Sequence, residues 1–266
     1  MGRAWGRSSP HLSRVPAVLI GVALTLLAVL VACGGGGSGK PSEPPGSLGA
    51  TLNRRVPSSI ANLPLTTDTG RTTSLAAWHG KTIVLTDFLT LCPDTCPLVS
   101  QNYAAMDHTL KAAGVASKVQ LVELTVDPQR DTPARLHAYR RLFGAPANWA
   151  LLTATPGTIK KVWAYFGAYY QRSPDPPPSI DWWTHKPLTY DVEHSDDLFY
   201  IDPQGHERFV IQGTPHALGK DMPAAMNTFL DSLGQRHLNA PMQSAWTAQQ
   251  ALQPVSWILG KQLGSG

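Results

Sequence analysis

The segment 81–97, KTIVLTDFLTLCPDTCP, constrains the fold more than any other part of the chain. It begins with an apolar run typical of a buried strand and ends with two cysteines, Cys92 and Cys96, each followed by a proline. Pro97 lacks an N–H group and suits the first turn of the helical pattern that follows. The segment therefore predicts two thiols between the carboxyl end of a strand and a helix, at the edge of an α/β sheet where ligands bind.

The other periodic segments predict an α/β fold with a mixed sheet flanked by helices, the plan of thioredoxin-like proteins. An N-terminal hairpin extension, at 61–80, precedes the cysteine-bearing strand. Further strands are predicted at 119–126, 149–153, 191–202 and 207–212, and helices at 97–113, 133–143, 156–169 and 215–233. We place this domain at 59–236 and assign no structure to the C-terminal extension, 237–266.

The N-terminal 32 residues resemble a bacterial lipoprotein signal peptide. Basic residues precede an apolar run that ends in Leu30-Val31-Ala32-Cys33, which is similar to a lipobox. The resemblance implies that Cys33 is lipidated and becomes the mature N-terminus; an uncleaved membrane helix is the alternative. Residues 33–58, rich in Gly, Ser and Pro, then form a flexible tether. Either way we expect the domain at the outer face of the cytoplasmic membrane.

The charge distribution excludes nucleic acid as a partner. The chain has 22 basic and 18 acidic side chains, and three of the basic ones (Arg3, Arg7 and Arg14) lie in the signal region. The remainder is nearly neutral, so it has no basic field for a polyanion.

Two thiols in this setting have three plausible uses. They can bind a soft metal ion, make and break disulfides, or form one inert structural disulfide. The prolines disfavour the inert disulfide, because we expect them to hold both thiols on an exposed turn. Three residues, Pro93, Asp94 and Thr95, separate the cysteines, one more than in thioredoxin-type oxidoreductases. The wider spacing suits two thiolates around one metal ion.

A soft metal would recruit a third ligand, and histidine is the expected type. Most of the nine histidines lie in turns, helices or loops, where an ordinary solvated or packed role explains them. His194 differs, because it lies in an acidic, turn-prone stretch directly before a strong apolar run. On local sequence alone it remains one candidate among several.

Three separated motifs resemble the Sco/SenC family of copper-binding, thioredoxin-like proteins. The first is Cys92-Pro93-Asp94-Thr95-Cys96-Pro97 after Asp87-Phe88. The second is Val126-Asp127-Pro128-Gln129-Arg130-Asp131-Thr132-Pro133. The third is Tyr190-Asp191-Val192-Glu193-His194-Ser195 with the strand and turn that follow it. The resemblance covers about residues 63–233, with the motifs in family order.

The resemblance implies that Cys92, Cys96 and His194 bind copper, as Cu(I) or Cu(II). It also implies that Asp127 and Asp131 lie near the site, as supporting residues or, for Asp131, as a helix N-cap. Leu89-Thr90-Leu91 departs from the family pattern, which is often more polar and aromatic there. The insert at 172–187 and the tail after Arg236 are not explained by the family.

The leading hypothesis is a lipid-anchored copper metallochaperone. By resemblance it would assist assembly of the dinuclear copper centre of cytochrome c oxidase, with the copper-bearing subunit or another copper protein as partner. The alternative is an enzyme, a thiol–disulfide oxidoreductase that uses Cys92 and Cys96 on client cysteines. A copper or redox sensor would need a signalling partner that the sequence does not indicate.

Overall fold

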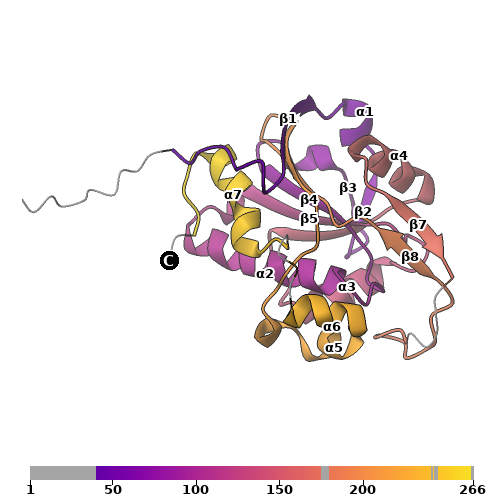
Figure 1. Ribbon diagram of the computed structural model, residues 1–266. Helices are drawn as coiled ribbons and strands as arrows, with labels where there is room; N and C mark the ends of the chain where they lie inside the picture. Colours follow the sequence, from indigo (N-terminus) through magenta and orange to yellow (C-terminus); the bar gives the residue numbers. More distant parts are fainter. Residues whose placement is uncertain (1–39, 175–179, 241, 243–244, 265–266) are drawn as a thin grey trace, which may run out of the picture. The chain divides into compact units, whose positions relative to one another are not determined.

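The computed structural model describes residues 40–174, 180–240, 242 and 245–264. These residues form an eight-stranded mixed sheet with helices on both faces, together with a separate two-stranded sheet (Figure 1). The predicted thioredoxin-like α/β class is confirmed. The predicted signal peptide, Cys33 and the first part of the predicted tether lie outside the described residues.

Three parallel strands form the centre of the large sheet: β4 (Thr82–Phe88), β5 (Val119–Thr125) and β6 (Trp149–Thr153). Every residue of β4 and β5 is buried, because helices cover both faces of the sheet. Burial on both faces explains why neither strand alternates regularly between apolar and polar residues.

Antiparallel strands complete the sheet in the order β1-β10-β9-β4-β5-β6-β2-β3. β9 (Leu198–Ile201) pairs with β4, and β10 (His206–Ile211) pairs with β9 after the predicted turn. β2 (Leu65–Thr67) and β3 (Thr72–Thr73) form the predicted N-terminal hairpin at the opposite edge. β7 (Tyr170–Ser173) and β8 (Asp191–His194) form the small sheet.

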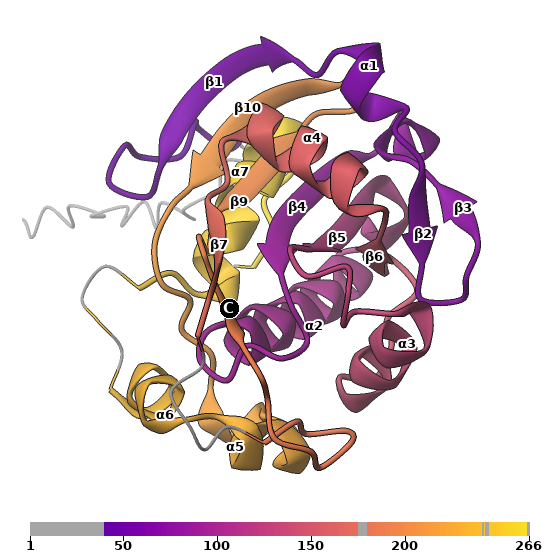
Figure 2. The same ribbon diagram turned by 90° about the vertical axis from the view of Figure 1, so that its right-hand side faces the viewer.

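The long helices divide between the two faces (Figures 1 and 2). One face carries α2 (Cys96–Ala112), α3 (Pro133–Leu142) and α7 (Ala248–Leu259), and the other carries α4 (Pro156–Phe166). The short helices are α1 (Ser58–Ala61), α5 (Ala224–Phe229) and α6 (Ser232–Asn239), with 3₁₀ turns at Leu75–Trp78, Ala116–Lys118 and Gly219–Asp221.

Local sequence sets the ends of α3 and α4. Thr132 and Thr155 each accept a backbone N–H at the N-terminus, and a proline follows each at the first helical position. Gly167 ends α4 in the left-handed conformation, with φ of 85°, so the helix stops before the predicted 169.

The flexible tether predicted over 33–58 is wrong for its last part. Residues Ala50–Arg55 form β1, which adds to the sheet edge through backbone hydrogen bonds to β10. An edge strand needs no apolar side chains, so its polar sequence gave no strand signal. Gly49 permits the close approach: a Cβ there would lie 2.0 Å from the carbonyl oxygen of Val210.

The helix predicted over 215–233 is also wrong. This stretch instead contains a 3₁₀ turn, α5 and the start of α6, and Pro223 precedes α5. Beyond Arg236, where no structure was assigned, α6 continues to Asn239 and α7 packs near α2, β4 and β9. The Tyr200 hydroxyl donates to the Ala251 carbonyl at 2.9 Å, which fastens α7 to the sheet.

Within the described ranges, no helix combines the length and apolar character needed to cross a membrane.

Candidate metal centre

The two cysteines lie where β4 gives way to α2, as predicted. The connection Leu89–Thr95, here called the ligand loop, leaves the carboxyl end of β4 and carries Cys92. Cys96 is the first residue of α2, and Thr95 rather than Cys96 occupies the N-cap position. The helix therefore starts one residue before the prediction.

The prediction from the prolines that both thiols lie on an exposed turn is wrong. Cys92 is 7% exposed and Cys96 is fully buried. Leu89, Leu91 and the first turn of α2 pack around them, and the Leu89 N–H donates to Cys96 Sγ at 3.4 Å. Both cysteines are free thiols.

His194 reaches the cysteines because the strand predicted over 191–202 is broken. The part ending at His194 is β8, which pairs with β7 outside the main sheet, and β9 begins only at Leu198. Between them, Ser195 and Asp196 use their side chains to bond Asp87 and Thr95. These contacts replace a strand ladder and direct the chain past the end of β4.

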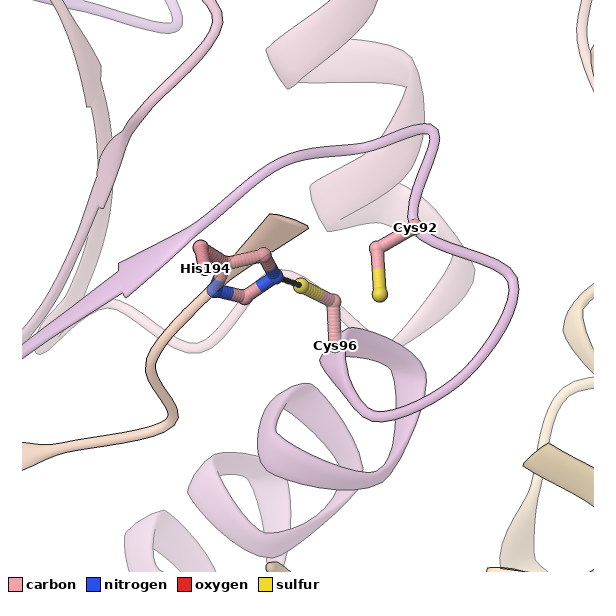
Figure 3. A group of neighbouring side chains, drawn as sticks. All are labelled: Cys92, Cys96 and His194. Atoms are coloured by element: carbon pink, nitrogen blue, oxygen red, sulfur yellow. Dashed lines mark hydrogen bonds between the residues drawn. The ribbon is translucent and has the colours of Figure 1, made fainter. Parts of the chain in front are cut away.

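The structure brings together Cys92, Cys96 and His194 from two distant segments (Figure 3). One donor atom from each residue lies within 4.8 Å of the other two. His194 Nε2 is 3.3 Å from Cys96 Sγ, and the His194 side chain is only 4% exposed. Two thiols and an imidazole at this spacing could converge on one metal ion.

A buried carboxylate orients the imidazole. His194 Nδ1 lies 2.9 Å from Asp87 Oδ2 and 2.5 Å from the Ser195 carbonyl oxygen. Since both neighbours are acceptors, Nδ1 carries a proton and donates it, which turns Nε2 toward the cysteines. A carboxylate behind a histidine fixes its tautomer and strengthens it as a metal ligand.

The two thiols and the imidazole influence one another's pKa values. Burial raises the pKa of Cys96, whereas the hydrogen bond from the Cys96 thiol and the nearby His194 lower the pKa of Cys92 well below its usual value. Burial opposes charging of His194, but Asp87 and Cys92 outweigh it and raise the pKa of His194 well above its usual range. These opposite directions favour a thiolate on Cys92 beside a protonated His194 when no metal is bound, so metal binding at Nε2 would release a proton.

Asp127 and Asp131 do not contact the three donor atoms; each supports a segment that carries one. Asp131 accepts from the Thr90 N–H at 3.3 Å and from the Thr90 hydroxyl at 2.5 Å, which secures the ligand loop. The helix N-cap that we considered for Asp131 is Thr132 instead. Asp127 accepts from the Tyr190 hydroxyl at 3.0 Å, four residues before His194.

The insert at 172–187 also supports the ligand loop. The indole of Trp182 donates to the Thr90 carbonyl at 2.7 Å and packs edge-on against Tyr139. The neighbouring Asp181 accepts two hydrogen bonds from the buried Arg135, at 2.9 and 2.7 Å, which anchors the insert to α3. Trp182 therefore covers the core beside the site, while Trp183 is 42% exposed.

Sequence reasoning missed Asp87, Asp196 and Trp182 as parts of the site. Asp87 had a usable signal, because a single acid inside a strand that reads as buried needs a buried partner. Asp196, whose burial raises its pKa to about 7, accepts from Thr95 Oγ1 at 2.7 Å. It and Trp182 lie in loops, where sequence does not show what a side chain faces.

Fold and site together define a thioredoxin-like protein with a Cys-Cys-His cluster at the carboxyl end of its central strand. The SCO1/SenC family model matches residues 57–236, which include all three cluster residues. The chain belongs to the SCO1/SenC family.

Similar proteins include mitochondrial and bacterial members of this family. Identity is 28% over 141 residues with the mitochondrial SCO2 homolog of Bos taurus, covering 51% of this chain and 47% of that protein. It is 32% over 114 residues with SenC of Rhodobacter capsulatus, covering 42% and 45%. The chain thus spans about half the length of these relatives. A copper-bound crystal structure of Arabidopsis thaliana ScoI matches with a TM-score of 0.47 and 25% identity, over 62% of this chain and 88% of that one.

Proposed function

We propose that this protein is a copper metallochaperone that binds one copper ion through Cys92, Cys96 and His194. The observation that carries the proposal is the convergence of these three donors within 4.8 Å, with Asp87 fixing the imidazole behind them. Thiolates select soft metals such as Cu(I), and imidazole suits copper in either valence. Membership of the SCO1/SenC family supports copper as the metal.

The arrangement suits transfer of copper to another protein. Three protein donors leave room for an incoming thiolate to attach before the first ligands leave. Cys92 is slightly exposed on the ligand loop, whereas Cys96 is held in α2 and fully buried. Cys92 is therefore the first ligand that a partner would replace. We propose the copper-bearing subunit of cytochrome c oxidase, or another copper protein, as that partner.

The proposed location is the outer face of the cytoplasmic membrane. The Leu-Val-Ala-Cys sequence at 30–33 supports a lipid anchor on Cys33, and two acyl chains hold a protein stably where one does not. Such an anchor would keep the domain beside a membrane-bound client.

A second function, thiol–disulfide oxidoreductase, is favoured by the unequal thiols. The Cys92 pKa is lowered and the Cys96 pKa is raised, the pattern of an attacking thiolate followed by a resolving thiol. Cys92 would attack a client disulfide and release one client thiolate. Cys96 would then attack Cys92 and release the second, so two electrons pass to the client and a Cys92–Cys96 disulfide remains.

Copper binding by the reduced full chain, solubilised in detergent, tests the proposal. Wild type is expected to bind one copper per chain, with a sulfur-to-copper charge-transfer band when the ion is Cu(II). His194→Ala should weaken binding by more than about 100-fold, because losing a ligand costs more than losing an outer partner. The control is His206→Ala, a partly exposed histidine beside Asp202. Equal affinity in His194→Ala and wild type, with disulfide reduction intact, would favour the oxidoreductase.

A further inference from the structure

Helix α6 lies directly against the ligand loop, although about 135 residues of sequence separate them. The Asp231 N–H, at the N-cap of α6, donates to the Pro93 carbonyl at 2.8 Å. The Asp231 carboxylate meanwhile accepts from the N–H groups of Leu233 and Gly234, each at 2.8 Å. Asp231 thereby caps the N-terminus of α6 and also binds this helix to the segment between the two cysteines.

Gly234 makes this close contact possible. A Cβ at Gly234 would lie 2.6 Å from the Pro93 carbonyl oxygen and 3.0 Å from that of Asp94. Both neighbours are backbone atoms, so neither can rotate away as a flexible side chain would. A glycine at this position therefore allows the backbone of α6 to lie close to the backbone of the ligand loop.

One turn further along α6, His237 binds the side chain at the centre of the loop. His237 Nδ1 is 2.7 Å from Asp94 Oδ1, and the two side chains are only 13% and 24% exposed. Asp94 lies midway between Cys92 and Cys96. His237 itself lies one residue beyond the stretch that the family model matches.

The opposite end of α6 is also fixed in place. Leu238 is 4% exposed, and the His237 carbonyl lies 3.4 Å from His216 Nδ1. Because this end of α6 is held by contacts outside the loop, a bond from His237 restrains the loop and not merely the helix.

We propose that His237 is a positioning residue, which ties the ligand loop to α6 through Asp94 and so slows the release of copper from Cys92 and Cys96. This inference rests on the proposed function. Copper can leave only when one thiolate moves away from the other ligands. That movement requires the loop between the cysteines to shift, and the Asp94–His237 contact opposes the shift. The contact lies in neither the ligand set nor the hydrophobic core.

The test measures transfer of copper from the loaded full chain to a Cu(I) chelator, bathocuproine disulfonate, by stopped-flow absorbance. His237→Phe keeps an aromatic ring but has no donor, and it should release copper about tenfold faster, the lower end of the effect of lost outer-shell partners. His237→Asn should return the rate to near the wild-type value, because its amide N–H can occupy the place of Nδ1. The matched control is His137→Phe, which removes a histidine–aspartate contact of 3.2 Å that does not touch the ligand loop.

A second pair of variants tests the same contact through the backbone. Gly234→Ala should also accelerate release, because the added Cβ displaces α6 from the Pro93 carbonyl. Gly157→Ala in α4 is its control, since a Cβ there meets nothing within 4 Å. Equal release rates in wild type, His237→Phe and Gly234→Ala would overturn the inference, as would failure of His237→Asn to restore the rate.

Thiol reactivity separates this inference from the proposed function. In metal-free protein, His237→Phe should raise the rate at which iodoacetamide modifies Cys92 by a similar factor, with His137→Phe unchanged. If wild type binds no copper but this acceleration is seen, the metallochaperone proposal fails together with any effect on copper release, and only the restraint of the ligand loop by His237 stands. If wild type binds and releases copper while neither rate changes in His237→Phe, only the positioning role fails.

Discussion

The neighbouring strands β4 and β5 each bury one carboxyl group, but the two groups have different hydrogen-bond partners. At the carboxyl end of β4, Asp87 is 1% exposed and faces His194, a group that can carry positive charge. In the interior beneath α2, Glu123 of β5 is fully buried and accepts from Ser100 Oγ at 2.9 Å. Ser100 in turn lies 3.1 Å from the Tyr139 hydroxyl.

The hydrogen-bond partner affects the pKa of each acid. Burial raises the pKa of both groups, to about 8 for Glu123. For Asp87 the hydrogen bond and the charge of His194 oppose that rise, although burial still leaves its pKa above the usual range. Glu123 faces neutral partners, the Ser100 hydroxyl and Trp149, and its pKa of about 8 keeps it mostly protonated at neutral pH. The two buried acids thus differ in what they face: Asp87 meets a histidine of the metal-ligand cluster, and Glu123 meets a hydroxyl group.

The largest expected effect concerns the interior acid. The folded pKa of Glu123, about 8, lies above its ordinary value of 4.5. The folded state therefore holds the proton more tightly, and the stability from this group is lost as the pH rises from about 4.5 to about 8. The slope is on the order of 1 kcal/mol per pH unit.

Glu123→Gln should remove this slope, because an amide does not titrate. Urea unfolding of metal-free protein at pH 5, 6.5 and 8 measures the effect. The control is Glu43→Gln, an exposed glutamate. An unchanged slope in Glu123→Gln would show that this acid is already ionised in the fold and that the two regions do not differ.

At the edge of the sheet, Asp87→Asn should weaken copper binding by about 10- to 100-fold, the usual cost of losing a carboxylate behind a ligating histidine. Competition with a chelator at pH 7 and pH 9 provides the measurement. The loss should be larger at pH 9, because at lower pH Asp87 also stabilises the protonated His194 that metal must displace. Equal affinities of variant and wild type at both pH values would mean that His194 needs no charged partner.

The smallest effect is expected from the loop contact made by the insert. Trp182→Phe keeps an aromatic ring against Tyr139 but loses the hydrogen bond to the Thr90 carbonyl, worth about 1 kcal/mol. Copper release should accelerate about fivefold by that figure. Trp183→Phe is the matched control, since Trp183 is 42% exposed and has no hydrogen bond to the loop. Equal acceleration in both variants would assign the effect to packing of the insert rather than to the bond.

Sequence by itself predicted the α/β class, the position of both cysteines and the turn between β9 and β10. These features depend on local signals: the apolar run Ile83-Val84-Leu85 in β4, prolines at helix starts, and a Pro-Gln-Gly turn. Resemblance to family motifs, rather than local pattern, singled out His194 among nine histidines.

Only the tertiary structure decided what surrounds those residues. Two hydrogen bonds join segments far apart in the chain: His194 with Asp87, and His237 with Asp94. The burial of Cys92 likewise depends on how the whole domain packs. β1 was missed because a sheet edge recruits a polar strand through its backbone alone. Local sequence records the preferences of neighbouring residues, whereas these contacts arise when the chain closes long loops and desolvates polar groups, which sets their charge.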